Sequence, residues 1–227
     1  MKKTIIIFGL LGIVLLSSYY YKRKFYDPQL KINNARKEVK QLTENDIIKD
    51  ADLIFQTSLS RQSKAIQLAT KSKYSHCGLI FKENNEVYVY EAVQPVKRTL
   101  LKKWIAKGEN GHYVIKRLKN ANQILTSETL EKLKKNCEQF SGKNYDLCFE
   151  WSDEKIYCSE LIWKVYQRAT GIEIGKLQQL RNFDLSNDAV KAKMRERYGN
   201  NIPLNEIVIS PSSIFESDQL ETVKSNE

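Results

Sequence analysis

The sequence contains few of the residues from which metal sites and redox sites are built. It has two histidines and four cysteines in 227 residues, and no two cysteines form a C-x-x-C pair. Structural zinc sites use four closely spaced Cys or His ligands, and thioredoxin-like sites use C-x-x-C. The sequence therefore disfavours both a structural zinc site and a disulfide-exchange protein, and no metal or other cofactor is expected.

Motifs for nucleic-acid recognition are also missing, although the formal net charge is +10. The lysines and arginines are scattered among acidic residues. There is no helix-turn-helix pattern, zinc-finger spacing or RNP-like aromatic motif to direct them onto bases. No nucleic-acid partner is therefore expected. A basic surface of this kind favours anionic surroundings such as phospholipid or cell-wall polymer.

The N-terminus lacks an A-x-A-like cleavage site but otherwise has the features of an export signal. MKK is followed by TIIIFGLLGIVLLSS, and no further charge occurs before Lys22. This pattern is typical of a secretory signal, while the uncharged run approaches the roughly 18–20 residues of a spanning helix. Residues 1–24 are therefore expected to be either a signal peptide or an N-terminal anchor in contact with a membrane. Both alternatives predict an exported protein of the cell envelope, whether periplasmic, extracytoplasmic or membrane-anchored.

Internal repeats and low-complexity tracts are absent, so the chain is interpreted as one domain with extensions. We expect a helical lead-in at 25–50, a domain at 51–216 and a flexible tail at 217–227. Thr99 is expected to cap a short helix that Gly108 closes. The predicted fold class is α+β, an antiparallel sheet with helices packed beside it. Its strands are expected within 51–58, 74–83, 86–93, 112–118 and 206–211, and its longer helices within 127–142, 158–170 and 187–199.

The four cysteines leave several alternatives open. Two disulfides are compatible with an exported chain. If one cysteine is a working thiol, three remain, and at least one more is then unpaired. The cysteines are Cys77, Cys137, Cys148 and Cys158.

Cys158 is the cysteine whose position indicates chemistry. The residues at i+3, i+4, i+7 and i+11 from it are apolar (Leu161, Ile162, Val165 and Ala169), so it belongs to the inward face of a helix and to its first turn. Unpaired N–H groups and the helix dipole favour an anion there, which lowers the pKa of a thiol. The same position also suits a small buried hydrophobic residue.

A nucleophilic thiol needs a base, and the two candidates are His76 and His112. A tight turn at Asn84-Asn85 would pair Glu83 with Glu86 and bring Gly78 opposite Glu91. Glu91 would then lie diagonal to His76 on one face of the hairpin, within reach of a long side chain. Strand alternation directs Cys77 to the other face, away from the site. A helix-start cysteine, a strand histidine and a carboxylate on the next strand form a papain-like set.

The segment GKNYDLCFEWSDEKIYCSELIWKVYQRATGI resembles the nucleophile region of NlpC-type papain-like enzymes, in which a G-x-x-Y segment precedes the cysteine helix. Because the histidine strand precedes the cysteine here, the chain is similar to the circularly permuted YaeF/YiiX group. The likeness extends over about Ala51–Phe215. It includes Glu160, which replaces the glycine of ordinary members, but not Cys77, where an aliphatic residue is usual.

The resemblance implies a circularly permuted papain-like fold and a set of roles. Cys158 would be the nucleophile, His76 the base, Glu91 the orienting carboxylate and Tyr145 an oxyanion or substrate contact. The expected function is an exported cysteine amidase or peptidase, with cell-wall peptides as one substrate class. The alternatives are a lipid-directed thiol acyl hydrolase or acyltransferase acting on lipid amides, and an envelope binding module without catalysis.

Overall fold

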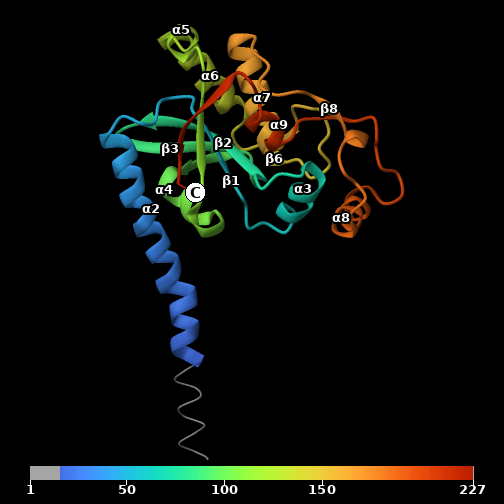
Figure 1. Ribbon diagram of the computed structural model, residues 1–227, viewed down its shortest axis with the longest axis horizontal. Coiled ribbons are helices and arrows are strands. Elements are labelled where there is room, and N and C mark those ends of the chain that lie inside the picture. The colour runs from blue at the N-terminus through green and yellow to red at the C-terminus, as the bar shows by residue number, and fades with distance from the viewer. Residues whose placement is uncertain (1–15, 227) are drawn as a thin grey trace, which may run out of the picture.

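Six antiparallel strands form the central sheet of the structure, a computed structural model that describes residues 16–226 (Figure 1). The strand order is β10-β5-β1-β2-β3-β4, which places the early strands β1 and β2 at the centre. The strands are β1 (Leu53–Gln56), β2 (His76–Glu83), β3 (Glu86–Glu91), β4 (Lys97–Leu100), β5 (Val114–Leu118) and β10 (Leu220–Ser225).

The β2–β3 hairpin has the register that the sequence predicts. Asn84 and Asn85 both have positive φ, 50° and 62°, and Glu83 pairs with Glu86. Leu79 pairs with Tyr90, so the register continued by one residue brings Gly78 opposite Glu91. A two-residue turn with both φ values positive matches the right-handed twist of the strands it joins. The expected parity of the hairpin is therefore confirmed.

Helices cover both faces of the sheet. α6 (Ser127–Phe140) and α7 (Cys158–Thr170) pack on one face, and α2 (Asp27–Glu44) and α4 (Leu101–Lys107) pack on the other. Alternate strand residues supply the two cores, because successive side chains of a strand point to opposite faces. Leu53, Phe55, Cys77, Leu79 and Phe81 belong to the α7 side, whereas Ile54, Ile80, Val87 and Val89 belong to the α2 side. The predicted α+β class is confirmed.

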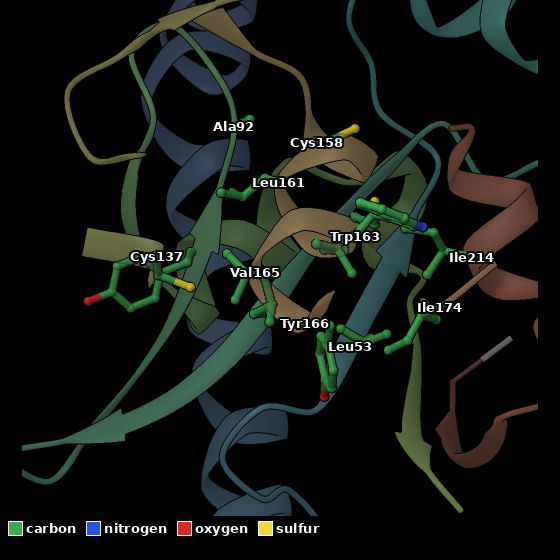
Figure 2. Close-up of a cluster of buried hydrophobic side chains, with 14 of the residues drawn as sticks. Leu53, Ala92, Cys137, Cys158, Leu161, Trp163, Val165, Tyr166, Ile174 and Ile214 are labelled. Carbon is green, nitrogen blue, oxygen red and sulfur yellow. The ribbon is translucent and has the colours of Figure 1, made fainter. Parts of the chain in front are cut away.

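α7 runs with its apolar stripe against the sheet. Figure 2 shows Cys158 at one end of this helix, with Leu161, Val165 and Tyr166 following along it. The helix ends at Gly171, whose φ of 74° is the left-handed conformation that glycine adopts without steric cost. The predicted start and end of the helix therefore both agree with the structure.

A smaller unit lies beside the sheet, where α3 (Ser63–Thr70) packs against α8 (Asp188–Tyr198) (Figure 1). Short elements connect the rest: a π-helix at Lys22–Tyr26, α5 (Ala121–Ile124), α9 (Pro211–Phe215), 3-10 turns at Glu109–Gly111 and Leu180–Asn182, and the strand pairs β6 (Asn144–Tyr145) with β7 (Lys155–Ile156) and β8 (Gln178–Gln179) with β9 (Ile207–Val208). The strand expected within 206–211 is thus β9, which lies outside the central sheet.

The N-terminal helix projects away from the sheet (Figure 1). Residues 16–21 are helical and lead through the π-helix into α2, whose Ala35 and Leu42 are buried in the core with α4. Residues 1–15, most of the predicted signal or anchor, lie outside the described residues. Across residues 16–226, no helix combines the length and the apolar character needed to cross a membrane.

Two expectations about the chain are settled by the structure. The flexible tail predicted at 217–227 is wrong for Leu220–Ser225, which form β10 and pair with β5 at the sheet edge. Buried Leu220 anchors this strand in the α7-side core and Val223 packs against the α2-side core, but the other strand residues are polar, which is why the sequence looked like a tail. All four cysteines are free, so no disulfide forms.

Gly78 provides a test of the close approach between β2 and β3. A Cβ atom there would lie 2.4 Å from Val89 Cγ1 and 2.7 Å from the Tyr90 carbonyl oxygen. We expect Gly78→Ala to lower the free energy of unfolding by about 1–3 kcal/mol, as overpacking does, measured from the urea midpoint. Lys135→Ala, an exposed position, is the control. Equal midpoints for both variants would contradict the tight strand pairing.

Candidate active site

Cys158 is the first residue of α7, and its side chain is almost fully buried, with 2% of its surface exposed. Tyr157 precedes it with extended backbone, φ −109° and ψ 168°. The N–H groups of the first helical turn have no acceptor within the helix, and the helix dipole is positive at this end. Cys158 therefore lies where a sulfur anion is stabilised.

The two residues after Cys158 fix the start of the helix. The Ser159 hydroxyl donates a hydrogen bond to the Ile209 carbonyl at 2.8 Å. The Tyr157 N–H donates to the Glu160 carboxylate at 3.4 Å, and the Lys164 ammonium lies 2.7 Å from that carboxylate. These contacts give the Ser159 and Glu160 of the C-S-E sequence a structural role, because they hold the turn that presents the thiol.

His76 is held between an aromatic ring and a carboxylate. Its Nε2 lies 2.7 Å from Glu91 Oε2, and its ring stacks on Trp104 at 5.8 Å between centroids. Thr99 Oγ1 donates to the other Glu91 oxygen at 2.6 Å. Since Nε2 is occupied by Glu91, Nδ1 is the nitrogen left for the hydrogen bond with Cys158. The diagonal contact predicted from the hairpin is present.

Cys77 does not lie away from the site, contrary to the sequence expectation. Strand alternation does direct it to the α7 side of the sheet, but Cys158 approaches from that same side. The thiol and the backbone N–H of Cys77 both lie close enough to the Cys158 sulfur to lower the pKa of the Cys158 thiol. The expectation was wrong because it assumed that Cys158 lies on the sheet face that carries His76. Cys158 instead approaches from the α7 side, and its thiol lies near both His76 and Cys77 at the start of β2.

The electrostatics favour a thiolate paired with an imidazolium. Hydrogen bonds from Cys77 and from His76, together with the His76 charge, hold the pKa of Cys158 well below its usual value although burial opposes this. Burial alone would lower the pKa of His76, but Cys158 and Glu91 outweigh it and raise that pKa to about 10. The pKa of Glu91 is lowered despite burial, chiefly by its hydrogen bond with His76. The charged pair therefore exists above the lowered Cys158 pKa and below the raised His76 pKa.

Tyr145 approaches the thiol from the β6–β7 pair. It pairs with Ile156 in a parallel register, two residues before Cys158. Burial and the nearby Cys158 raise the pKa of its phenol well above the ordinary value, so the hydroxyl keeps its proton. Its oxygen accepts a hydrogen bond from Gln62 Nε2 at 2.8 Å.

A cleft of about 390 Å³ opens beside these residues. This volume suits a small ligand or one residue or two of a peptide. Most of the lining residues are of polar types and one is a lysine, but the surface that they expose to the cleft is mostly apolar. The lining residues are Gln56, Ser58, Ser60, Gln62, Ser75, His76, Glu91, Ala92, Val93, Gln94, Lys107, Tyr145 and Leu147.

The sequence also predicted the position of Thr99 wrongly and did not predict other contacts of this site. Thr99 does not cap a helix: it belongs to β4, and Leu100 is the N-cap of α4. Val89 pairs with Thr99, so extending the hairpin count to β4 would have placed Thr99 diagonal to Glu91. No sequence signal marks Gln62 or Trp104. The second histidine, His112, is exposed and bonds the Asn226 carbonyl.

Comparison with known proteins gives consistent matches. Residues 48–224 match a family model described as permuted papain-like amidase enzyme, YaeF/YiiX, C92 family. A protein of Escherichia coli K12, described as the uncharacterized protein YiiX, is 52% identical over 172 residues, which are 76% of this chain and 84% of that protein. A crystal structure described as the metalloprotein YiiX of E. coli O157:H7 has a TM-score of 0.75 and 52% identity, and the match covers 78% of this chain and 97% of that one.

Replacing Cys77 tests its contact with the thiolate. Cys77→Ala removes a hydrogen-bond donor, so the pKa of Cys158 rises and its thiolate is lost at a higher pH as the solution is acidified. A hydrogen bond to a charged group contributes about 1.5–3 kcal/mol, so the pH at which iodoacetamide labelling of Cys158 falls to half its maximal rate should rise by about one to two pH units. Labelling is measured by peptide mass spectrometry.

Cys137→Ala is the matched control, because Cys137 is equally buried in the same core. It should leave the pH profile of Cys158 labelling unchanged. An identical profile for Cys77→Ala and the wild type would show that Cys77 does not support the thiolate.

Proposed function

The chain belongs to the YaeF/YiiX family of permuted papain-like amidases, the C92 family, and from this premise we propose that it cleaves an amide bond by thiolate attack from Cys158. The observation that carries the proposal is the arrangement of His76 between the Cys158 thiol and the Glu91 carboxylate. A nucleophile, a base within hydrogen-bond reach and a group that orients the base are the parts that this chemistry requires.

In the first half-reaction the Cys158 sulfur attacks the amide carbonyl carbon, and the carbonyl π electrons move to oxygen. The tetrahedral intermediate then collapses: the C–N bond breaks, the His76 imidazolium gives its proton to the departing amine, and a thioester remains on Cys158. In the second half, neutral His76 takes a proton from water as the water oxygen attacks the thioester. The second tetrahedral intermediate collapses with cleavage of the C–S bond, which restores the thiolate–imidazolium pair. The carboxylic acid product leaves and gives its remaining proton to solvent.

The oxyanion of the intermediate needs two hydrogen-bond donors. The Cys158 backbone N–H is one, because it belongs to the first helical turn and has no acceptor within the helix. The Tyr145 hydroxyl is the other. Its raised pKa keeps it protonated throughout the pH range in which the ion pair exists.

Polar groups along the cleft can hydrogen-bond a peptide, although the exposed surface of the lining is mostly apolar. Serine and glutamine are the most frequent lining residues, and the exposed Lys107 adds a positive charge near Glu91. An ammonium group at the rim attracts a free carboxylate. We therefore favour a peptide amide with a nearby carboxylate, a description that cell-wall peptides fit.

The description of the E. coli structure as a metalloprotein implies a metal site, but these side chains offer no such site. Within residues 16–226, no three His, Cys, Asp or Glu side chains are grouped so that they could hold a metal ion. At the site itself, Glu91 uses one oxygen for His76 and the other for Thr99. The donors present do not fit a metal centre, and no step of the mechanism passes through one.

A lipid-amide substrate is the second candidate, and the N-terminal helix favours it. Tyr19, Tyr20, Tyr21, Phe25 and Tyr26 are exposed along this helix, interleaved with basic residues at 22–24. Aromatic and cationic side chains of this kind favour the headgroup layer of a membrane.

We propose an exported, membrane-associated domain. Recovery of the full chain in the soluble cytoplasmic fraction after cell fractionation would contradict this location.

Substrate panels compared with Cys158→Ala test the function. Purified full-length protein should release amine and carboxylate from soluble cell-wall peptides, and Cys158→Ala should lose at least about 10³-fold of that turnover, since it removes the proposed nucleophile. His112→Ala is the matched control and should retain wild-type turnover.

A parallel arm presents N-acyl lipids in anionic vesicles. Hydrolysis confined to that arm would replace the peptide substrate by the lipid amide. No turnover of either substrate, or equal turnover by wild type and Cys158→Ala, would overturn the proposal. If neither substrate is turned over, a binding module without catalysis remains as the alternative.

A further inference from the structure

Tyr145 is joined by hydrogen bonds to two polar residues that the mechanism above does not use. Gln62 Nε2 donates to the Tyr145 hydroxyl at 2.8 Å, and Arg197 donates to Gln62 Oε1 at 2.5 Å. Gln62 lies just before α3, Arg197 near the end of α8, and Tyr145 in β6. These three segments are far apart in the sequence and meet beside Cys158.

The donor and acceptor chemistry of the three groups fixes the direction of the hydrogen bonds. Arginine has only donors, whereas a carboxamide has an acceptor at one end and donors at the other. Arg197 therefore requires the Gln62 oxygen to face it, and the Gln62 NH₂ group must face Tyr145. The Tyr145 oxygen accepts this bond, so its own proton is directed elsewhere.

We propose that Arg197 and Gln62 are positioning residues that aim the Tyr145 hydroxyl proton at the substrate oxyanion, an inference that rests on the proposed function. Without Arg197, the Gln62 side chain is free to turn over and present its oxygen to Tyr145. The Tyr145 proton would then bond to Gln62 and be lost to the oxyanion. Arg197 thus fixes the orientation of the Gln62 carboxamide, and this orientation determines the direction of the Tyr145 hydroxyl proton.

The scaffold behind this chain of hydrogen bonds is held by packing and by polar contacts. α3 and α8 share a small core in which Leu180, Val190 and Met194 are buried. The Arg197 guanidinium lies over the Phe149 ring at 4.8 Å, and the neighbouring Tyr198 hydroxyl donates to the Cys148 carbonyl. Both contacts join α8 to the loop that follows Tyr145. The α3–α8 unit contains none of the proposed catalytic residues, yet it holds the groups that contact Tyr145.

Gln62→Glu is the sharpest test because it keeps the size of the side chain and replaces the donor by an acceptor. The carboxylate retains Arg197 as a partner but takes the Tyr145 proton. We expect kcat to fall on the order of 10²-fold, as when one oxyanion donor is removed, with little change in KM. Tyr145→Phe should lose a similar factor, and the double variant should lose no more than either single variant.

Arg197→Leu and Arg195→Leu form a matched pair on the same helix. Arg195 is exposed and lies one residue from Glu196. Arg197→Leu should lose kcat by a few-fold, because Gln62 then populates both orientations, and Arg195→Leu should lose none. Iodoacetamide labelling of Cys158 should be unchanged in all of these variants, since the thiolate–imidazolium pair is not altered.

Neutron diffraction locates the Tyr145 hydroxyl hydrogen without any need for turnover. The hydrogen should point away from residue 62 in the wild type and toward residue 62 in Gln62→Glu. A wild-type hydrogen directed at Gln62, or wild-type kcat in Gln62→Glu, overturns the inference. If the expected orientation is seen and no amide is hydrolysed, the positioning stands and the proposed function fails.

Discussion

The contact between the Cys158 thiol and the His76 imidazole is the interaction on which the account of this protein depends. Two buried, oppositely charged groups stabilise each other only if each is also hydrogen-bonded. Here the thiolate receives hydrogen bonds from Cys77 and lies at a helix N-terminus, while the imidazolium has Glu91 on its far side and Trp104 on its face. Removal of His76 would leave the buried Cys158 and Glu91 without the cation that they share.

The fold supplies these supports from one end of the sheet. β2 begins with His76, β3 ends with Glu91, and the N-terminus of α7 meets the sheet at the same place. Short-range contacts then fix each group: Thr99 holds Glu91, and Ser159 and Glu160 hold the first turn of α7. The site is built on regular elements, which limits the movement of its side chains.

The sequence pattern within single elements was enough to predict the helix of Cys158 and the hairpin that carries His76 and Glu91. The apolar stripe after Cys158 predicted its helix, and Asn84-Asn85 predicted the hairpin register that joins His76 to Glu91. The role of Cys77 could not be predicted, because it depends on which face of the sheet α7 covers. Gln62 and Arg197 were missed for a similar reason, since only the packing of α3 against α8 brings them together. β10 was missed because an edge strand with a single buried anchor resembles a polar tail.

The charge state of His76 in solution decides whether the thiolate–imidazolium pair exists. The chain has two histidines, so ¹⁵N NMR of the imidazole side chains, with His112→Gln for assignment, resolves His76 alone. We predict that the His76 imidazolium persists at pH 7 to 9 and loses its proton only near pH 10. A neutral His76 ring at pH 7 would contradict the thiolate–imidazolium pair and the mechanism built on it.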